Sequence, residues 1–186
     1  IQNEYINNKT GRKMLSSIRT EIYGLNNIKK YCQTNSINEI EDFKLYNKEK
    51  VKDGDGNIVK PIDYPDLNFR VSLQSEKDIF KTSNFGKNIL NNWGNNKKIF
   101  RNMNRISYIN DNFPLRIDMS IVKESHKKKF LIPEYTIQEA KVFESNVKYE
   151  IEIEFNNRVF NNLYSSFDLN TMTKKLHNDI KKISRI

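Results

Sequence analysis

The chain has 186 residues, which suits one domain with a substantial core and leaves little room for two. Aromatic residues make up 11% of it, which argues against a disordered chain, and the single cysteine excludes an internal disulfide and a cysteine-based zinc cluster. The formal net charge of +9 favours a polyanionic partner such as RNA, a nucleotide or phosphate.

The amino-terminal part is predicted to contain short strands separated by turns. Residues 1–16 are polar and are interpreted as a loop or frayed terminus. Residues 17–23 predict a strand followed by a short helix over 25–31, and residues 43–51 predict a second strand. The sequence Asp-Gly-Asp-Gly-Asn at 53–57 is typical of a hairpin turn.

Alternating apolar and polar residues predict four further strands, at 67–74, 98–109, 113–121 and 147–155. The Asn-Asp-Asn sequence at 110–112 predicts a tight turn, so the strands on either side of it should form a hairpin. Residues 77–96 are compatible with a helix ahead of a Gly-Asn turn. Residues 168–185 predict an amphipathic helix, because apolar side chains recur there at helical spacing.

These elements predict a mainly β, α+β domain over residues 17–186, with antiparallel strands and peripheral helices. No segment approaches the roughly 18 apolar residues that a membrane span requires, and no signal-peptide pattern is present. We therefore expect a soluble intracellular protein with no membrane partner.

The polar faces of the predicted strands separate acidic from basic side chains. One face of 147–155 carries Glu150, Glu152 and Glu154, spaced by about 7 Å, so their mutual repulsion calls for counter-charge such as a divalent cation held by oxygen ligands. Other strands carry cations that would repel one another unless a polyanion lay between them. These cations are Arg19, Lys44, Arg70, Arg101, Arg105 and Arg116.

A closed antiparallel barrel with a polar lumen and a helix-packed apolar outside would bring such strands face to face. A triphosphate could then bridge the cations on one wall and a metal ion on the other. In that register Arg105 and Arg116 face the lumen, whereas Ile106 and Ile117 face outward into packing. Taken alone, however, the Glu-Ile-Glu-Ile-Glu motif is more simply explained as an amphipathic strand with one face in water.

Several segments resemble the triphosphate tunnel metalloenzymes. Tyr149-Glu-Ile-Glu-Ile-Glu154 is similar to the carboxy-terminal metal-binding strand of that family. The segments 100–107 and 115–123 resemble a hairpin of the mRNA capping enzymes of large DNA viruses, and 17–32 and 68–76 are similar to other parts of those domains. The resemblance runs, with gaps, from about Ser17 to Phe155.

The resemblance implies a metal-dependent RNA 5′-triphosphatase that uses Mg²⁺ or Mn²⁺. It implies that Glu150 and Glu152 bind the metal, with Glu154 as a further ligand. It also implies that the catalytic residues are Glu150, Glu152, Arg105 and Asp118. Asp118 would orient a nearby cation or a metal-bound water. The remaining cations would bind phosphate, namely Arg19, Lys44, Arg70, Arg101, Arg116 and Lys123. Lys123 lies off the alternation of its strand, so a bulge or strand end would have to bring it into the lumen.

The sequence departs from the family pattern at two places. Met103 occupies a position that is usually basic, so Arg101 would take over its role. The family also has a second Glu-x-Glu strand near its amino terminus, whereas Glu4 is alone before Ser17. We therefore expect that residues 1–186 lack that strand.

The resemblance further implies 5′-triphosphate RNA as substrate and guanylyltransferase and methyltransferase domains or subunits as partners. It places the protein in the host cytoplasm, at the virus factory, or in the virion. A non-catalytic basic RNA-binding or scaffolding domain, or a tunnel-fold polyphosphatase, remains an alternative, because one fold can support several functions.

Overall fold

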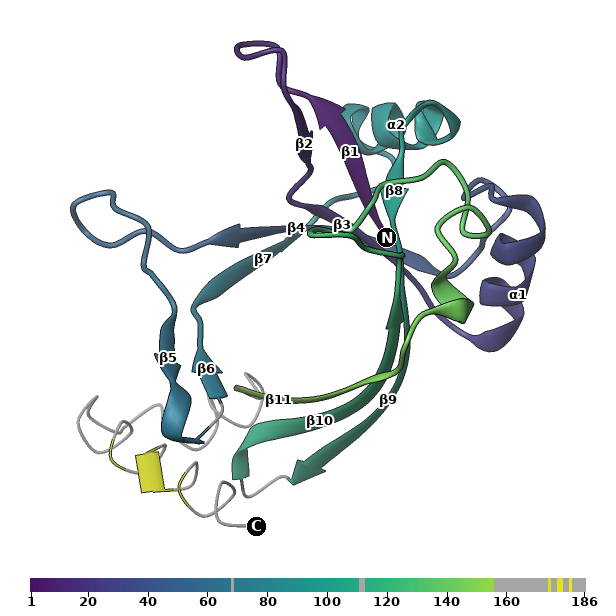
Figure 1. The fold of residues 1–186 in the computed structure, drawn as a ribbon. Helices are drawn as coiled ribbons and strands as arrows, with labels where there is room; N and C mark the ends of the chain where they lie inside the picture. The colour runs from purple at the N-terminus through teal and green to yellow at the C-terminus, as the bar shows by residue number, and fades with distance from the viewer. Residues whose placement is uncertain (68, 111–112, 156–173, 175–176, 179–180, 182–186) are drawn as a thin grey trace. The chain divides into compact units, whose positions relative to one another are not determined.

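The computed structural model describes residues 1–67, 69–110 and 113–155, together with positions 174, 177, 178 and 181 (Figure 1). The chain divides into two compact units, where its length had suggested one folding unit. The first comprises Ile1–Asp63, Arg70–Asn102 and Lys123–Asn146. The second comprises Tyr64–Phe69, Met103–Val122 and Val147–Ile186.

Two three-stranded antiparallel sheets belong to the first unit. One has the order β3-β4-β7, formed by β3 (Ile18–Ile22), β4 (Phe43–Lys50) and β7 (Gln74–Asp78). The other has the order β2-β1-β8, formed by β1 (Gln2–Ile6), β2 (Lys13–Leu15) and β8 (Lys98–Ile99). The strands predicted at 17–23 and 43–51 are thus confirmed to within a residue or so at each end.

The interpretation of residues 1–16 as a loop is wrong, because β1 and β2 form a hairpin there. Its turn is built by Asn7, whose Oδ1 accepts a hydrogen bond from the Lys9 amide at 2.9 Å and whose carbonyl accepts one from the Gly11 amide at 2.8 Å. Gly11 has a φ of 65°, a conformation that glycine adopts without steric cost. Turn chemistry therefore outweighed the polar composition of this segment.

Two α-helices belong to the first unit. Helix α1 (Leu25–Thr34) extends the short helix predicted over 25–31, and α2 (Asn84–Asn91) lies within the segment 77–96. The Ser83 hydroxyl caps α2 by accepting a hydrogen bond from the Gly86 amide at 3.0 Å. The described residues also include three short 3₁₀ helices: η1 (Pro65–Leu67), η2 (Trp93–Asn95) and η3 (Val142–Glu144).

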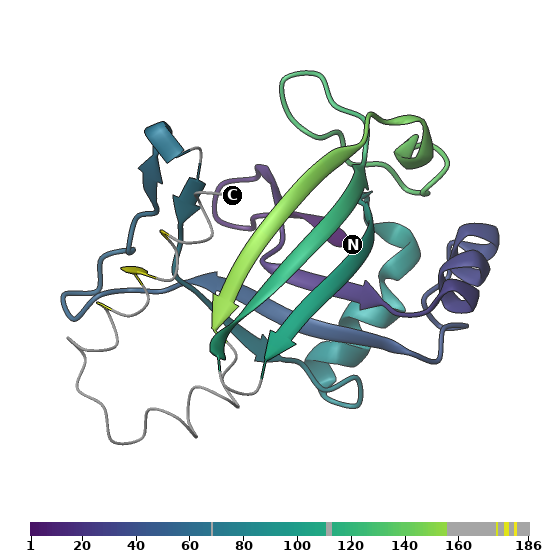
Figure 2. The same cartoon turned by 90° about the horizontal axis from the view of Figure 1, so that it is seen from below.

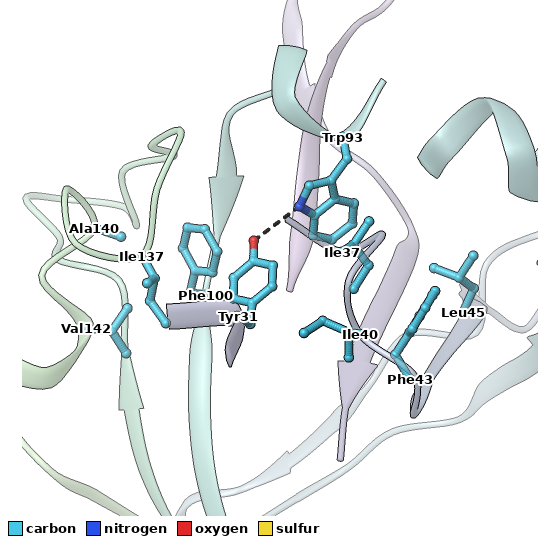
Figure 3. Packing of buried hydrophobic residues seen from close by; sticks show 10 residues of the cluster. All are labelled: Tyr31, Ile37, Ile40, Phe43, Leu45, Trp93, Phe100, Ile137, Ala140 and Val142. Atoms are coloured by element: carbon cyan, nitrogen blue, oxygen red, sulfur yellow. Dashed lines mark hydrogen bonds between the residues drawn. The ribbon is translucent and has the colours of Figure 1, made fainter. Parts of the chain in front are cut away.

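The hydrophobic core of the first unit is centred on aromatic residues (Figure 3). The Trp93 indole N–H donates to the Tyr31 hydroxyl at 3.2 Å, and the two rings pack edge to face with centroids 6.1 Å apart. Phe100 lies beside Tyr31, with ring centroids 6.3 Å apart. The remaining members are mostly aliphatic: Ile37, Ile40, Phe43, Leu45, Ile137, Ala140 and Val142. This core joins α1, β4, η2 and the segment around η3.

A third antiparallel sheet, of order β11-β10-β9, supplies most of the strand structure of the second unit (Figure 2). Its strands are β9 (Arg101–Asn110), β10 (Phe113–Glu124) and β11 (Lys148–Phe155). The predicted pairing of β9 with β10 is confirmed, since they are neighbours in this sheet, whereas residues 111 and 112 of the predicted turn lie outside the described residues. The predicted strand 98–109 is divided at Phe100, which is buried in the core of the first unit.

The predicted strand 67–74 is also divided. Its first part is β6 (Phe69–Val71), which pairs with β5 (Ile62–Tyr64), and its end begins β7. Between β4 and β5 the turn at 53–57 forms as predicted. Asp53 Oδ1 accepts hydrogen bonds from the amides of Asp55 and Asn57 at 3.0 and 2.8 Å.

The mainly β, α+β class is confirmed: the described residues form four small antiparallel sheets and two α-helices. Hydrogen bonding among these residues does not close a barrel. Across the same residues, no helix has the length and apolar character needed to cross a bilayer. The amphipathic helix predicted for 168–185 lies outside the described residues, except at four helical positions.

Much of the apolar face of the β11-β10-β9 sheet is exposed, although Leu115 near the start of β10 is only 2% exposed. Ile106 is 61% exposed and Ile151 65%, and the same face includes Tyr108, Met119, Ile121 and Tyr149, each at least 47% exposed. The expectation that Ile106 faces into packing is therefore wrong for the described residues. Alternation determines which side chains share a face, but it does not supply the element that covers that face.

Candidate functional site

The polar face of the β11-β10-β9 sheet gathers the charged residues that the sequence singled out. In the antiparallel register of β10 and β11, Arg116 lies opposite Glu154, Asp118 opposite Glu152 and Ser120 opposite Glu150. Successive side chains of a strand point to opposite faces, so these six share one face. Cross-strand partners lie close enough for direct contact.

Two arginines connect this face into an ion-pair network. The Arg105 side chain, from β9, donates through Nη2 to Glu152 Oε2 at 2.7 Å and through Nε to the Ser120 hydroxyl at 3.2 Å. Arg116 Nη2 donates to Glu154 Oε2. Both guanidinium groups also approach one oxygen of Asp118, with Arg105 Nη1 and Arg116 Nη2 each 3.1 Å from Oδ2.

Asp118 is the buried centre of this network. Its side chain is 1% exposed, whereas those of Arg105 and Arg116 are 32% and 35% exposed. The two contacts to Oδ2 have ion-pair distances but not hydrogen-bond angles, and Oδ1 has no hydrogen-bond partner among the described residues. The contacts still pair opposite charges, because Coulomb attraction depends on distance far more than on angle. Asp118 therefore keeps unused acceptor capacity in a buried position.

The network carries a net negative charge. Arg105 and Arg116 contribute two positive charges, whereas Asp118, Glu152 and Glu154 contribute three negative charges, which leaves one in excess. Glu150 adds a further carboxylate to the same face. This face therefore attracts cations, although the whole chain is basic.

The carboxylates are not arranged as a metal-binding cluster. Among the described residues, no three His, Cys, Asp or Glu side chains lie close enough to hold a metal ion. Glu152 and Glu154 do not converge on a common point, because each forms an ion pair with an arginine, Arg105 and Arg116 respectively. As placed, these residues do not fit a metal centre, and the buried Asp118 Oδ1 is the position with unused capacity for a donor or cation.

A second charged group lies in the first unit, on the polar face of β3 and β4. Glu21 accepts hydrogen bonds from the hydroxyls of Tyr23 at 2.6 Å and Tyr46 at 2.7 Å. Burial and the hydrogen bond to Glu21 raise the pKa of Tyr46, so its hydroxyl remains a proton donor. Lys44 Nζ lies 2.8 Å from Asp78 Oδ1, and this ion pair connects β4 to the neighbouring β7.

Arg19 belongs to this second group and is poorly compensated. Burial lowers the pKa of Arg19, the interaction with Tyr46 offsets part of this shift, and the positive charge of Arg101 lowers the pKa again. Its Nη1 atom is buried without a hydrogen-bond partner among the described residues. Buried guanidinium donors without acceptors favour an anion, which could supply both charge and hydrogen bonds.

Two predicted phosphate ligands are engaged elsewhere. Arg70 makes a two-pronged ion pair with Asp63, with Nε at 2.6 Å from Oδ1 and Nη2 at 3.0 Å from Oδ2. Lys123 Nζ donates to the Phe143 carbonyl, and Lys123 lies one residue before the end of β10. Both belong to the first unit, like Arg19, Lys44 and Arg101.

Sequence reasoning thus identified the members of the network, with the exception of Ser120. Strand alternation could have identified Ser120, because it places this residue on the same face as Arg116 and Asp118. The Tyr46–Glu21 pair was missed for a different reason: it depends on cross-strand neighbours that alternation does not reveal. Comparison with protein-family models, curated proteins and solved structures finds no match for the chain.

Proposed function

We propose that this chain is a metal-dependent RNA 5′-triphosphatase that removes the γ-phosphate of nascent RNA in the first step of cap formation. The observation that carries the proposal is the network on β9, β10 and β11, in which the buried Asp118 lies between two arginines on a face that also carries three glutamates. Phosphoryl transfer calls for this combination, because cations neutralise phosphate oxygens while a carboxylate can position a water molecule.

In the proposed reaction, water attacks the γ-phosphorus and the bond from that phosphorus to the β–γ bridging oxygen breaks. The products are a diphosphate-ended RNA and orthophosphate. Arg105 and Arg116 would bind the phosphate oxygens, and Asp118 would orient both guanidinium groups from its buried position. A glutamate of β11 would hold the attacking water and accept its proton.

The proposed enzyme further has a closed tunnel with a polar lumen. In it, Glu150, Glu152 and Glu154 would hold Mg²⁺ or Mn²⁺, and Arg19, Lys44 and Arg101 would contact phosphate. A viral capping enzyme with guanylyltransferase and methyltransferase partners, in a virus factory or virion, completes the proposed setting. In the second unit, the net negative face of β10 and β11 supports a bound cation. In the first unit, Arg19 Nη1 is buried without a hydrogen-bond partner among the described residues, which supports an anion contact there.

The test is release of orthophosphate from RNA labelled at its γ-phosphate, measured with EDTA, Mg²⁺ or Mn²⁺. Glu152→Gln and Arg116→Gln should abolish metal-dependent release. Ile151→Thr is the matched control, because Ile151 is 65% exposed on the opposite face of the same strand, and it should keep wild-type turnover. Wild-type turnover by Glu152→Gln would refute the site.

A non-catalytic RNA-binding module is the competing function, and two observations favour it: the net charge of +9 and the engagement of Glu152 and Glu154 by arginines. Equilibrium binding separates the two functions. The enzyme should bind triphosphate-ended RNA more tightly than monophosphate-ended RNA of the same sequence. The module should bind both equally, with affinity that falls steeply as salt is raised and is indifferent to Mg²⁺ at constant ionic strength.

A further inference from the structure

We infer that the segment from His126 to Tyr135, together with Lys97, is a contact surface for single-stranded RNA. We call this surface the basic loop, and it lies wholly within the first unit. Its lysines would contact successive phosphates, and its exposed aromatic rings would stack on bases. The inference goes beyond the proposed reaction, because it concerns the body of an RNA strand and not its 5′-triphosphate end.

The first argument is the positive charge of the basic loop. Lys127, Lys128 and Lys129 are consecutive and exposed, and none of them forms an ion pair within the part of the chain that the structure describes. Glu134 is the one acidic residue in the sequence of the loop, and its Oε2 lies 3.4 Å from Lys97 Nζ. Four lysines against one carboxylate leave an excess of three positive charges, which favours a polyanion.

The second argument is that aromatic rings accompany these cations. Phe130 is 75% exposed and Tyr135 is 48% exposed. Lys129 Nζ lies 5.8 Å from the centroid of the Phe130 ring, and Lys97 Nζ lies 5.3 Å from that of Tyr135. Surfaces that bind single strands without sequence preference combine cations for the backbone with aromatic rings for the bases. The basic loop has both kinds of group side by side.

The third argument is that the base of the loop is fixed to the core of the first unit. The hydroxyl of Ser125, a residue only 1% exposed, accepts a hydrogen bond from the Phe100 amide at 2.8 Å. The His126 amide donates to the Ala140 carbonyl at 2.8 Å, and the Ile132 amide closes the loop by donating to the His126 carbonyl at 3.0 Å. A loop held in this way loses less conformational entropy when it binds a ligand.

A membrane surface is the main alternative partner for a basic segment with an exposed aromatic residue. Membrane insertion strengthens with the apolar area that is buried. Next to the exposed Phe130, however, Leu131 and Ile132 are half-buried, so the loop offers little apolar area at its tip. A single strand makes better use of separate rings that each have an ammonium group nearby.

The experiment measures binding of the full chain to a fluorescein-labelled, mixed-sequence RNA of about 15 nucleotides that ends in a 5′-hydroxyl. Fluorescence anisotropy in EDTA, at several salt concentrations, gives the affinity and its salt dependence. Each phosphate contact with a single strand contributes about 0.7 to the slope of log affinity against log salt, so Lys127→Gln, Lys128→Gln and Lys129→Gln together should flatten it by about 2. The matched control removes the same charge from exposed lysines of α1 and α2, namely Lys29→Gln, Lys30→Gln and Lys87→Gln.

A second set of variants tests the aromatic contact without changing charge. Phe130→Leu keeps an apolar side chain but removes the ring, and it should weaken RNA binding about tenfold, whereas Phe130→Trp should retain wild-type affinity. Phe80→Leu is the matched control, because Phe80 is 77% exposed elsewhere in the first unit. The circular dichroism spectrum and melting temperature of each variant identify any loss of fold.

The inference is supported if the lysine variant flattens the salt dependence more than its control and Phe130→Leu alone among the aromatic variants weakens binding. Equal losses in the two triple-lysine variants would mean that only overall charge matters, and would overturn it. Wild-type affinity in Phe130→Leu, or no RNA binding by the wild type, would also overturn it. So would Phe130-dependent binding to phosphatidylserine vesicles without Phe130-dependent RNA binding. The probe carries no 5′-triphosphate, so the phosphate-release assay judges the proposed function separately.

Discussion

Replacing Asp118 with Asn should destabilise the β11-β10-β9 sheet more than any other single polar substitution on its charged face. Asparagine has the same shape, so the change removes charge without creating a cavity. In the native network one oxygen of Asp118 lies 3.1 Å from both Arg105 Nη1 and Arg116 Nη2, in a side chain that is 1% exposed. Without that charge, the two guanidinium groups repel each other across a neutral amide.

The magnitude follows from the burial of each partner. Breaking a fully buried ion pair costs about 3–5 kcal/mol. Arg105 and Arg116 are about one third exposed, so water recovers part of this loss and we expect about 2–3 kcal/mol for Asp118→Asn. Ser120→Ala removes one hydrogen bond from Arg105 Nε and should cost about 1 kcal/mol. Glu154→Gln alters a half-exposed pair and should cost less than about 1 kcal/mol.

The assay is urea unfolding of the full chain combined with hydrogen exchange of the β10 and β11 amides. Hydrogen exchange reports this sheet directly, whereas fluorescence of Trp93 reports the first unit. The expected order of destabilisation is Asp118→Asn, then Ser120→Ala, then Glu154→Gln. If Asp118→Asn matches or exceeds wild-type stability, or if Glu154→Gln is the more damaging change, the assignment of Asp118 as the buried centre of the network is refuted.

Three further predictions concern the first unit. Burial lowers the pKa of Lys98 to about 8 from its ordinary value of 10.5, so folding is penalised below pH 8 and the penalty is relieved as pH rises to 10.5. Lys98→Met should therefore gain about 3 kcal/mol over wild type at pH 7 and lose that advantage near pH 10.5, and an advantage independent of pH would contradict this. A Cβ added at Gly86 would lie 2.3 Å from a backbone oxygen, whereas none lies within 4 Å at Gly94. Gly86→Ala should thus lower the melting temperature clearly more than Gly94→Ala, and equal shifts would argue against that close approach. Tyr31→Phe leaves the buried Trp93 N–H without its acceptor and should cost about 1–3 kcal/mol in urea unfolding; an unchanged midpoint would mean that the bond contributes nothing.

Strand alternation and turn chemistry were sufficient to predict much of the sheet structure. The sequence places Arg116, Asp118 and the glutamates of β11 on the polar faces of their strands, and the register aligns Arg116 with Glu154 and Asp118 with Glu152. This succeeds because the side-chain period of a strand is two whatever the surroundings. The turn at 53–57 was equally predictable, since Asp53 makes its hydrogen bonds to residues only two and four positions away.

The partners of those side chains were decided only by the tertiary structure. The three glutamates suggested a metal-binding wall, whereas Glu152 and Glu154 lie against arginines from β9 and β10 of the same sheet. The burial of Asp118 and Lys98 and the exposure of Ile106 and Ile151 were equally invisible in the sequence. Alternation determines the side of a strand from which each side chain projects. Segments that are distant in the sequence decide whether a side chain on that face contacts an opposite charge, packs in the core or is exposed to solvent. The tertiary structure therefore sets the pairing and the burial of each charged residue.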